Sequence, residues 1–180
     1  MSNLEINAAF DRKPIESIPM QSTGDVDAAL VLADRTAKDR ANWLPIWRRV
    51  EILEKAAAIM RGRAEELARQ SSREGGKPLL DSRVEVNRGI EGVKTAIAEL
   101  STMHGQEIPM GLTPSSANRL AFTHREARGV ATAISAFNHP FNLIIHQVIP
   151  AVAVGCPIIV KPALTTPLSC RNVINILYEA

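Results

Sequence analysis

GVATAISAFNHPFNLIIHQVIPAVAVGCPIIVKPALTTPLSCRNVINILYEA, residues 129–180, is the stretch that decides the fold of this chain. It opens with a short apolar run, 129–135, that has the length of a buried strand. A mostly apolar segment, 141–154, follows and is long enough for a helix. The order then repeats, with a β-branched run at 157–160 and a second helical pattern at 168–180. This order predicts a βαβα unit with parallel strands and a right-handed crossover.

Polar side chains follow both predicted strands. Asn138 lies just past the end of the first, and Lys161 lies at the end of the second. Ligands of open parallel sheets gather beyond the carboxyl ends of the strands. We therefore expect one amide and one cation at the same edge of the sheet.

Three ordered motifs resemble those of the aldehyde dehydrogenase superfamily. Residues 136–142 (AFNHPFN) resemble its Pro-Trp/Phe-Asn-x-Pro motif, and residues 160–167 (VKPALTTP) resemble its second cofactor motif, at the family's spacing. Upstream, residues 74–78 (EGGKP) resemble its Glu-x-Gly-Lys-Pro turn. The resemblance implies an α/β fold: N-terminal helices, a short bridging strand segment and the first βαβα unit of a Rossmann-like NAD(P)-binding domain.

By this resemblance the chain divides into three parts. Residues 1–111 form the N-terminal helical part of the cofactor domain, 112–128 a bridging or oligomerisation segment, and 129–180 the start of an incomplete Rossmann-like cofactor-binding unit. The family's Gly-Gln-x-Cys nucleophile motif and its glutamate base are absent from these 180 residues. We therefore expect the chain to be the N-terminal portion of a longer protein or a truncated product.

The first part shows mainly helical patterns. Residues 1–24 have no sustained period and predict an extended arm, after which Asp25 suits the N-cap of a first helix. Apolar residues spaced by three and four predict one long amphipathic helix over 46–67. A third helix is expected after Pro78, and a polar loop then leads to a predicted strand at 120–125.

Composition excludes several classes of protein. Twenty-one basic and 19 acidic residues give a net charge of +2, without the basic excess of a nucleic-acid-binding protein. Polar residues, glycine and proline interrupt the longest apolar run, 143–160, so a membrane span is not expected. Two cysteines and no apolar leader predict a soluble protein of a reducing compartment, the cytoplasm.

Asn138 is the predicted catalytic residue. Oxidation of an aldehyde through a thiohemiacetal places negative charge on the former carbonyl oxygen, which a fixed amide N–H can stabilise. The resemblance implies that Asn138 supplies this donor, together with a backbone N–H elsewhere. The alternative is that Asn138 merely caps the helix that begins near Pro140.

Cofactor contacts are expected in two turns. By resemblance, NAD or NADP contacts Ser135, Ala136, Phe137, Asn138, Lys161, Pro162, Ala163 and Leu164. The family's lysine at position 161 hydrogen-bonds the adenosine ribose, and the alternative is a solvated strand end. Many NAD-using members carry a ribose-binding glutamate where this chain has Leu164, so NAD versus NADP stays open, with tolerance of NADP favoured. No Gly-x-Gly-x-x-Gly loop follows the first strand.

Arg88 is the predicted substrate-selecting residue. It lies two residues from Val86, roughly 200° around the helix from the apolar stripe, and so points away from the core. One interpretation is a solvated side chain. By resemblance, however, this position lines the aldehyde entrance tunnel, where an arginine suits a carboxylate or phosphate, and Asn142 and Leu143 face the same tunnel. The Asn-His-Pro-Phe-Asn variant likewise resembles the branch that handles small or anionic aldehydes.

The cysteines and histidines offer no further site. Cys156 begins a buried strand, and Cys170 lies in the first turn of a helix, whose N-terminus could lower its pKa. Neither is a good nucleophile candidate. The four histidines show no metal-ligand pattern, so no metal is expected.

The predicted function is therefore that of the N-terminal part of an aldehyde dehydrogenase, which oxidises a small aldehyde to a carboxylic acid with NAD(P). The resemblance implies a homo-oligomer, a dimer or tetramer, when full length, with no nucleic-acid or membrane partner. Two alternatives stay open: a non-catalytic fragment that binds a dinucleotide or a partner chain, and an enzyme that acylates coenzyme A. Because the nucleophile is absent, the chain alone is expected to be inactive.

Overall fold

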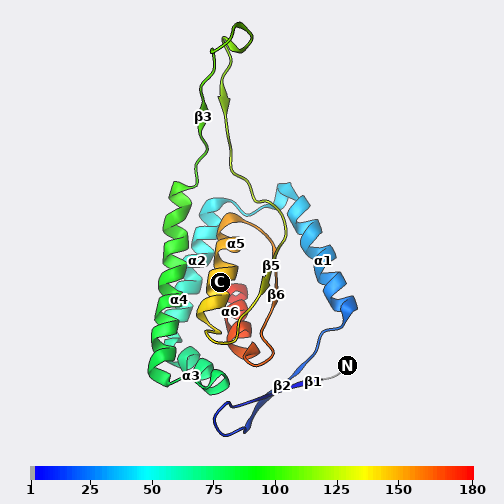
Figure 1. The fold of residues 1–180 in the computed structure, drawn as a ribbon, viewed down its shortest axis with the longest axis vertical. Coiled ribbons are helices and arrows are strands. Elements are labelled where there is room, and N and C mark those ends of the chain that lie inside the picture. Colours follow the sequence, from blue (N-terminus) through cyan, green and yellow to red (C-terminus); the bar gives the residue numbers. More distant parts are fainter. Residues whose placement is uncertain (1–2) are drawn as a thin grey trace.

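The centre of the molecule is a parallel pair of strands, β5 (Ala131–Ile134) and β6 (Ile158–Lys161), in a computed structural model that describes residues 3–180 (Figure 1). Helix α5 (Asn142–Val154) connects the strands, and α6 (Pro167–Glu179) follows β6. Gly155 ends α5 with a φ of 83°, a left-handed conformation that suits glycine. The predicted order of elements and the parallel pairing are confirmed.

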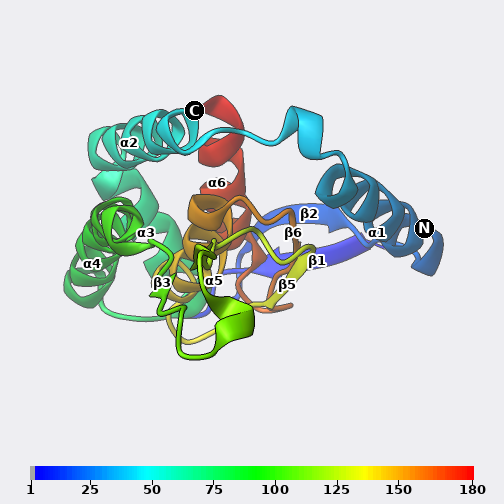
Figure 2. The same ribbon diagram turned by 90° about the horizontal axis from the view of Figure 1, so that it is seen from above.

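Helices cover one face of the strand pair, and the other face is covered only in part, since Thr132 and Ile134 of β5 are exposed. Helices α5 and α6 lie between the strands and a layer formed by α2 (Ile46–Gly62), α3 (Ala64–Gly75) and α4 (Leu79–Glu99) (Figure 2). Helix α1 (Thr23–Lys38) lies on the opposite side, against β6 (Figure 2). Short 3-10 turns occupy Arg40–Asn42, Leu100–Thr102 and Pro114–Ser116.

The hydrophobic core lies between α5, α6 and the α2–α4 layer. Its fully buried large side chains come from these helices and from the N-cap of α5, and they include Leu53, Met60, Leu67, Val86, Val93, Phe141, Ile144 and Val173. The predicted long helix over 46–67 is wrong in one respect, because it breaks at Arg63, whose φ of −108° and ψ of 15° are not helical. The break redirects the chain, so that α3 packs against both α4 and α6.

The N-terminal part differs most from its prediction. Strands β1 (Asn3–Asn7) and β2 (Pro14–Pro19) pair antiparallel, so an extended arm over residues 1–24 is wrong where the structure describes them. In β1, Leu4 and Ile6 alternate with polar residues, a strand period that spans only five residues. In α1 the N-cap is Ser22 rather than Asp25, and Asp25 completes a capping box from the third helical position.

A narrow ribbon, β3 (Glu107–Ile108) and β4 (Ala121–Phe122), projects away from the helices (Figure 1). The predicted strand at 120–125 is therefore shorter than expected, and the ribbon begins before residue 112, the predicted start of the bridging segment. Phe122 is 71% exposed at the ribbon surface. Within residues 3–180, no helix is long and apolar enough to cross a membrane.

Candidate active site

The carboxyl ends of β5 and β6 lie side by side, as the sequence predicts. Ile134 pairs with Lys161, and the backbone N–H of Ser135 donates to the Lys161 carbonyl oxygen at 3.0 Å. The turns 135–138 and 161–164 therefore share one edge of the sheet, which we call the carboxyl edge. Asn138 and Lys161 are both exposed there, and the Lys161 ammonium donates to the Pro162 carbonyl at 2.9 Å.

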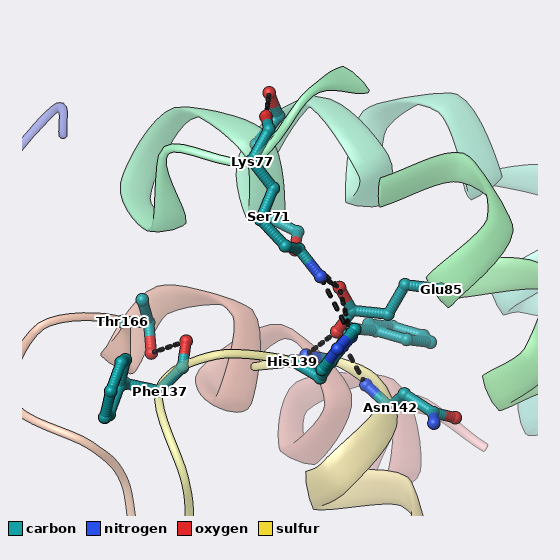
Figure 3. A network of polar contacts seen from close by, with 9 residues as sticks. Ser71, Lys77, Glu85, Phe137, His139, Asn142 and Thr166 are labelled. Atoms are coloured by element: carbon teal, nitrogen blue, oxygen red, sulfur yellow. Dashed lines mark hydrogen bonds and ion pairs between the residues drawn. The ribbon is translucent and has the colours of Figure 1, made fainter. Parts of the chain in front are cut away.

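The Asn138 turn is held on both sides. Before it, the Phe137 carbonyl accepts a hydrogen bond of 3.4 Å from the Thr166 hydroxyl (Figure 3). After it, the Nδ1 atom of His139 lies 3.1 Å from the Lys77 ammonium (Figure 3). Among residues 3–180, no hydrogen bond to the Asn138 side chain is seen, so its amide N–H groups are available to a ligand.

A buried carboxylate, Glu85, caps helix α5. Its Oε1 atom accepts from the backbone N–H groups of Phe141 and Asn142 at 2.8 and 3.0 Å, and its Oε2 atom accepts from Lys77 and, at 3.3 Å, from Ser71 (Figure 3). The alternative in which Asn138 caps this helix is therefore wrong. Glu85 is buried although Asn87, equally close to Val86 of the apolar stripe, is exposed, so no local signal marks it.

A second buried carboxylate, Glu74, caps helix α6. Its two oxygens accept from the backbone N–H groups of Leu168 and Ser169 at 3.0 and 2.6 Å. Burial raises the pKa of Glu74, and these hydrogen bonds oppose the effect only partly. Two residues on, Gly76 ends α3 with a φ of 75°, where a Cβ would lie 2.9 Å from the Cβ of Ala9.

These contacts explain the motif 74–78. Glu74 caps α6, Gly76 turns the chain, Lys77 pairs with Glu85, and Pro78 precedes α4. The sequence identified the motif only by resemblance, because its contacts reach residues far away in the chain. Its function in this structure is to join the α3–α4 turn to the first turns of α5 and α6.

Arg88 lies where the helical pattern predicts, exposed on α4 and away from the core. It lines a cavity of about 510 Å³ between α4 and α5, together with Asn87, Glu91 and His146. Among the described residues, Arg88 has no ion-pair partner. The backbone of Asn142 takes part in the Glu85 cap, while its side chain is buried and its Oδ1 atom accepts no hydrogen bond within residues 3–180. Leu143 is half-buried.

Other predicted cofactor contacts lie along the same edge. Phe137 and Leu164 are both exposed and line a cavity of about 450 Å³ that reaches the β1–β2 hairpin. Ser135 is buried at the strand end. The remaining three residues, Ala136, Pro162 and Ala163, are half-buried.

Neither cysteine is placed to act at Asn138. Cys170 is 2% exposed, and burial, assisted by the charge of Glu74, raises its pKa to about 11. The possibility that the helix N-terminus lowers this pKa is therefore wrong. Cys156 precedes β6, whose first residue pairs with the first residue of β5, so it lies at the edge opposite Asn138. No cluster of three or more His, Cys, Asp or Glu side chains suited to a metal occurs within residues 3–180.

Comparisons with known proteins show the family to which the chain is similar. A sequence model described as the aldehyde dehydrogenase family matches residues 2–180. The chain is 33% identical over 177 residues to 3-sulfolactaldehyde dehydrogenase of Priestia aryabhattai, covering 98% of this chain and 36% of that protein. It is 33% identical over 178 residues to lactaldehyde dehydrogenase of Methanocaldococcus jannaschii, covering 99% and 37%.

Solved structures show the same fold. Aldehyde dehydrogenase 21 from Physcomitrella patens, in complex with the reaction product succinate, superposes with a TM-score of 0.93 at 31% identity. Glyceraldehyde-3-phosphate dehydrogenase from Methanocaldococcus jannaschii, complexed with NADP, superposes with a TM-score of 0.90 at 32% identity. Each match covers 99% of this chain but only 37% and 38% of the other. The chain thus spans little more than a third of these relatives.

Proposed function

This chain belongs to the aldehyde dehydrogenase family, and we propose that the complete protein oxidises a small aldehyde to a carboxylic acid with NAD or NADP. The observation that carries this proposal is the free side-chain amide of Asn138 at the carboxyl edge, beside the turn that holds Lys161. The chain contributes the oxyanion donor and part of the cofactor site, and residues beyond it complete the enzyme.

The role of Asn138 follows from the charge that develops in the reaction. Addition of a thiolate to the aldehyde makes the carbonyl carbon tetrahedral and leaves negative charge on its oxygen. The Asn138 amide can donate to that oxygen, because its side chain is exposed and has no hydrogen bond among residues 3–180. A bound nicotinamide cofactor supplies the hydride acceptor.

The residues of the carboxyl edge fit the ribose end of such a cofactor. Lys161 offers an exposed ammonium at a strand end, and among residues 3–180 its only hydrogen bond is to the carbonyl oxygen of the next residue, so it can turn to a ribose hydroxyl. Leu164, 55% exposed beside it, carries no charge to repel a 2′-phosphate. Two structural relatives are complexed with NADP, which supports use of either dinucleotide.

Arg88 favours an aldehyde that carries a negative charge. Its guanidinium lines the cavity between α4 and α5 with no ion-pair partner among the described residues, and a carboxylate, sulfonate or phosphate would supply one. The names of several relatives point the same way, because sulfolactaldehyde and glyceraldehyde-3-phosphate are anionic aldehydes. In this proposal Asn142 and Leu143 border the aldehyde path at the start of α5.

The catalytic nucleophile lies outside this chain in our proposal, and residues 1–180 alone do not turn over. The buried Cys170, with a pKa of about 11, is mainly a thiol at neutral pH and is not an effective nucleophile. Cys156 lies at the opposite edge from Asn138. Both cysteines are free, which supports a cytoplasmic location.

We also propose that the complete protein is a homo-oligomer that assembles through the β3–β4 ribbon. The ribbon extends from the helical body (Figure 1) and exposes Leu112, Leu120 and Phe122. Exposed apolar side chains on a short two-stranded ribbon are typical of an interface rather than of a free surface.

Asn138→Ala in the complete protein tests the proposed function. Loss of one oxyanion donor should lower kcat by about 10²–10³-fold. The measurement is NAD(P)H formation with several small aldehydes, alongside wild type and the isolated residues 1–180. An unchanged kcat would refute the role of Asn138, and turnover by the isolated residues would refute an external nucleophile.

A further inference from the structure

We propose that Glu85 and Lys77 are positioning residues that hold the Asn138 amide at the developing oxyanion. This inference rests on the proposed function of Asn138. Neither residue contacts the aldehyde in this proposal. Both act through the backbone of the turn between β5 and α5, which carries Asn138.

The orientation of the Asn138 side-chain amide depends on the backbone of the turn that carries it. Its own side chain has no hydrogen bond among residues 3–180, so its direction depends on where the backbone lies. On the α5 side, Glu85 Oε1 holds the N–H groups of Phe141 and Asn142 at 2.8 and 3.0 Å (Figure 3). The Leu143 N–H donates to the His139 carbonyl at 3.0 Å and joins the turn to the first turn of the helix.

Lys77 makes this cap electrostatically possible. The Glu85 side chain is 1% exposed, and a carboxylate removed from water to this extent needs compensation. Lys77, 19% exposed, pairs with Oε2, while the positive end of the α5 dipole faces Oε1. The Ser71 hydroxyl adds a donor at 3.3 Å.

Lys77 also reaches the turn directly. Its ammonium lies 3.1 Å from His139 Nδ1, and because an ammonium only donates, Nδ1 is the acceptor in this contact. His139 is the residue after Asn138. One cation therefore links the buried carboxylate of α4 to the side chain next to the proposed catalytic amide (Figure 3).

Close packing leaves the cap little freedom to move. A Cβ added to Gly89 of α4 would lie 2.6 Å from the Cε1 atom of Phe141, so the aromatic ring rests directly on the glycine. Phe141 is fully buried. The first turn of α5 is thus held against α4 by the ring on one side and by the Glu85 carboxylate on the other.

The kinetic consequence is a loss of alignment. An oxyanion donor works only when its N–H lies at hydrogen-bonding distance from the reacting oxygen, and a misplacement of about 1 Å can cost about 10²-fold in rate. Release of the Glu85 cap should therefore lower kcat through Asn138 and leave KM for NAD(P) nearly unchanged. If Glu85 only stabilised the fold, the effect of its substitution on kcat would be the same with and without the Asn138 side chain.

A double-mutant cycle in the complete protein tests the inference. Glu85→Gln keeps the side-chain size but removes the charge that pairs with Lys77, and we expect kcat to fall by about 10–100-fold. In the Asn138→Ala background the same change should lower kcat by less than about threefold, because the amide that it displaces is gone. Lys77→Met, which leaves the Glu85 carboxylate in place, should show the same dependence on Asn138 if Glu85→Gln does not fold. Lys77→Arg, which keeps the charge, should retain more of the rate than Lys77→Met.

Glu74→Gln is the matched control, because Glu74 is equally buried, at 3% exposed, and caps α6 in the same way. Its effect on kcat should depend on Asn138 far less than that of Glu85→Gln, because α6 reaches the Asn138 turn only through the 3.4 Å contact of Thr166 with the Phe137 carbonyl. If Glu85→Gln and Lys77→Met act independently of Asn138, the positioning role is refuted while the oxyanion role stands. If Asn138→Ala alone leaves kcat unchanged, the proposed function itself fails, which separates the two failures.

Discussion

Helices α5 and α6 begin after the two strand ends of the carboxyl edge, and at each a buried glutamate accepts two backbone N–H groups. Glu85 does so at α5 and Glu74 at α6. Only the first carboxylate has a cationic partner among the described residues, Lys77. At the second, burial prevails and raises the pKa of Glu74.

The difference between the two caps matches the roles that we propose for the two turns, oxyanion stabilisation by Asn138 and cofactor binding by Lys161. The turn with Asn138 is held by Lys77, Glu85 and Thr166, which suits a donor that has to meet a charge at one fixed place. The Lys161 ammonium is exposed, and within the described part of the chain it donates only to the neighbouring Pro162 carbonyl, which suits a contact that forms when a cofactor binds. In our proposal, the cap with a cationic partner serves alignment, and the cap without one lies next to the turn that binds the cofactor.

The largest expected effect on stability is at the α5 cap. Glu85→Gln removes the partner of Lys77 and should lower the free energy of unfolding by about 3 kcal/mol, the lower end of the cost of breaking a buried ion pair, because Lys77 keeps partial access to water. Denaturant unfolding of the complete protein would measure it. If Glu85→Gln lowers the free energy of unfolding no more than Glu74→Gln does at neutral pH, the proposed difference between the two caps is refuted.

Lys161→Ala should weaken binding of the cofactor. One lost hydrogen bond to a charged group costs roughly 1.5–3 kcal/mol, so the KM for NAD(P) should rise by more than tenfold while that for aldehyde changes little. Calorimetric titration with NAD and NADP gives the affinity directly. Unchanged affinity would show that Lys161 is only a solvated strand end.

Arg88→Leu should have a smaller and selective effect. The guanidinium is exposed, so its pair with a bound anion should be worth about 1 kcal/mol, close to a fivefold loss of kcat/KM for an aldehyde with a carboxylate, sulfonate or phosphate. A neutral aliphatic aldehyde of similar length is the control. Equal losses for both substrates would assign Arg88 a structural role.

The smallest expected effect is the pH dependence of the α6 cap. A carboxyl whose folded-state pKa lies above its ordinary value of 4.5 stabilises the fold in its protonated form, and this contribution is lost as pH rises through the raised pKa. Glu74→Gln resembles the protonated acid and should escape that loss. The Tm of the variant minus that of wild type should therefore increase as pH rises from about 4 to 7. A difference that shrinks over this range would mean that the ionised carboxylate is the better cap.

Local patterns in the sequence determined the central unit. The apolar runs, the turn residues and Gly155 are local features of the sequence. They predicted both strands, both helices and the sheet edge shared by Asn138 and Lys161. Resemblance added the residue roles. The helical period also placed Arg88 outside the core, because a face of a helix follows from spacing alone.

Tertiary structure alone decided how that edge is held. Glu85 reaches residues 56 and 57 positions away, and Glu74 reaches residues 94 and 95 positions away, so no local window contains both partners. The raised pKa of Cys170 likewise depends on neighbours brought together by folding. A glutamate has the same chemistry in any helix, and only burial against a helix N-terminus makes it a cap.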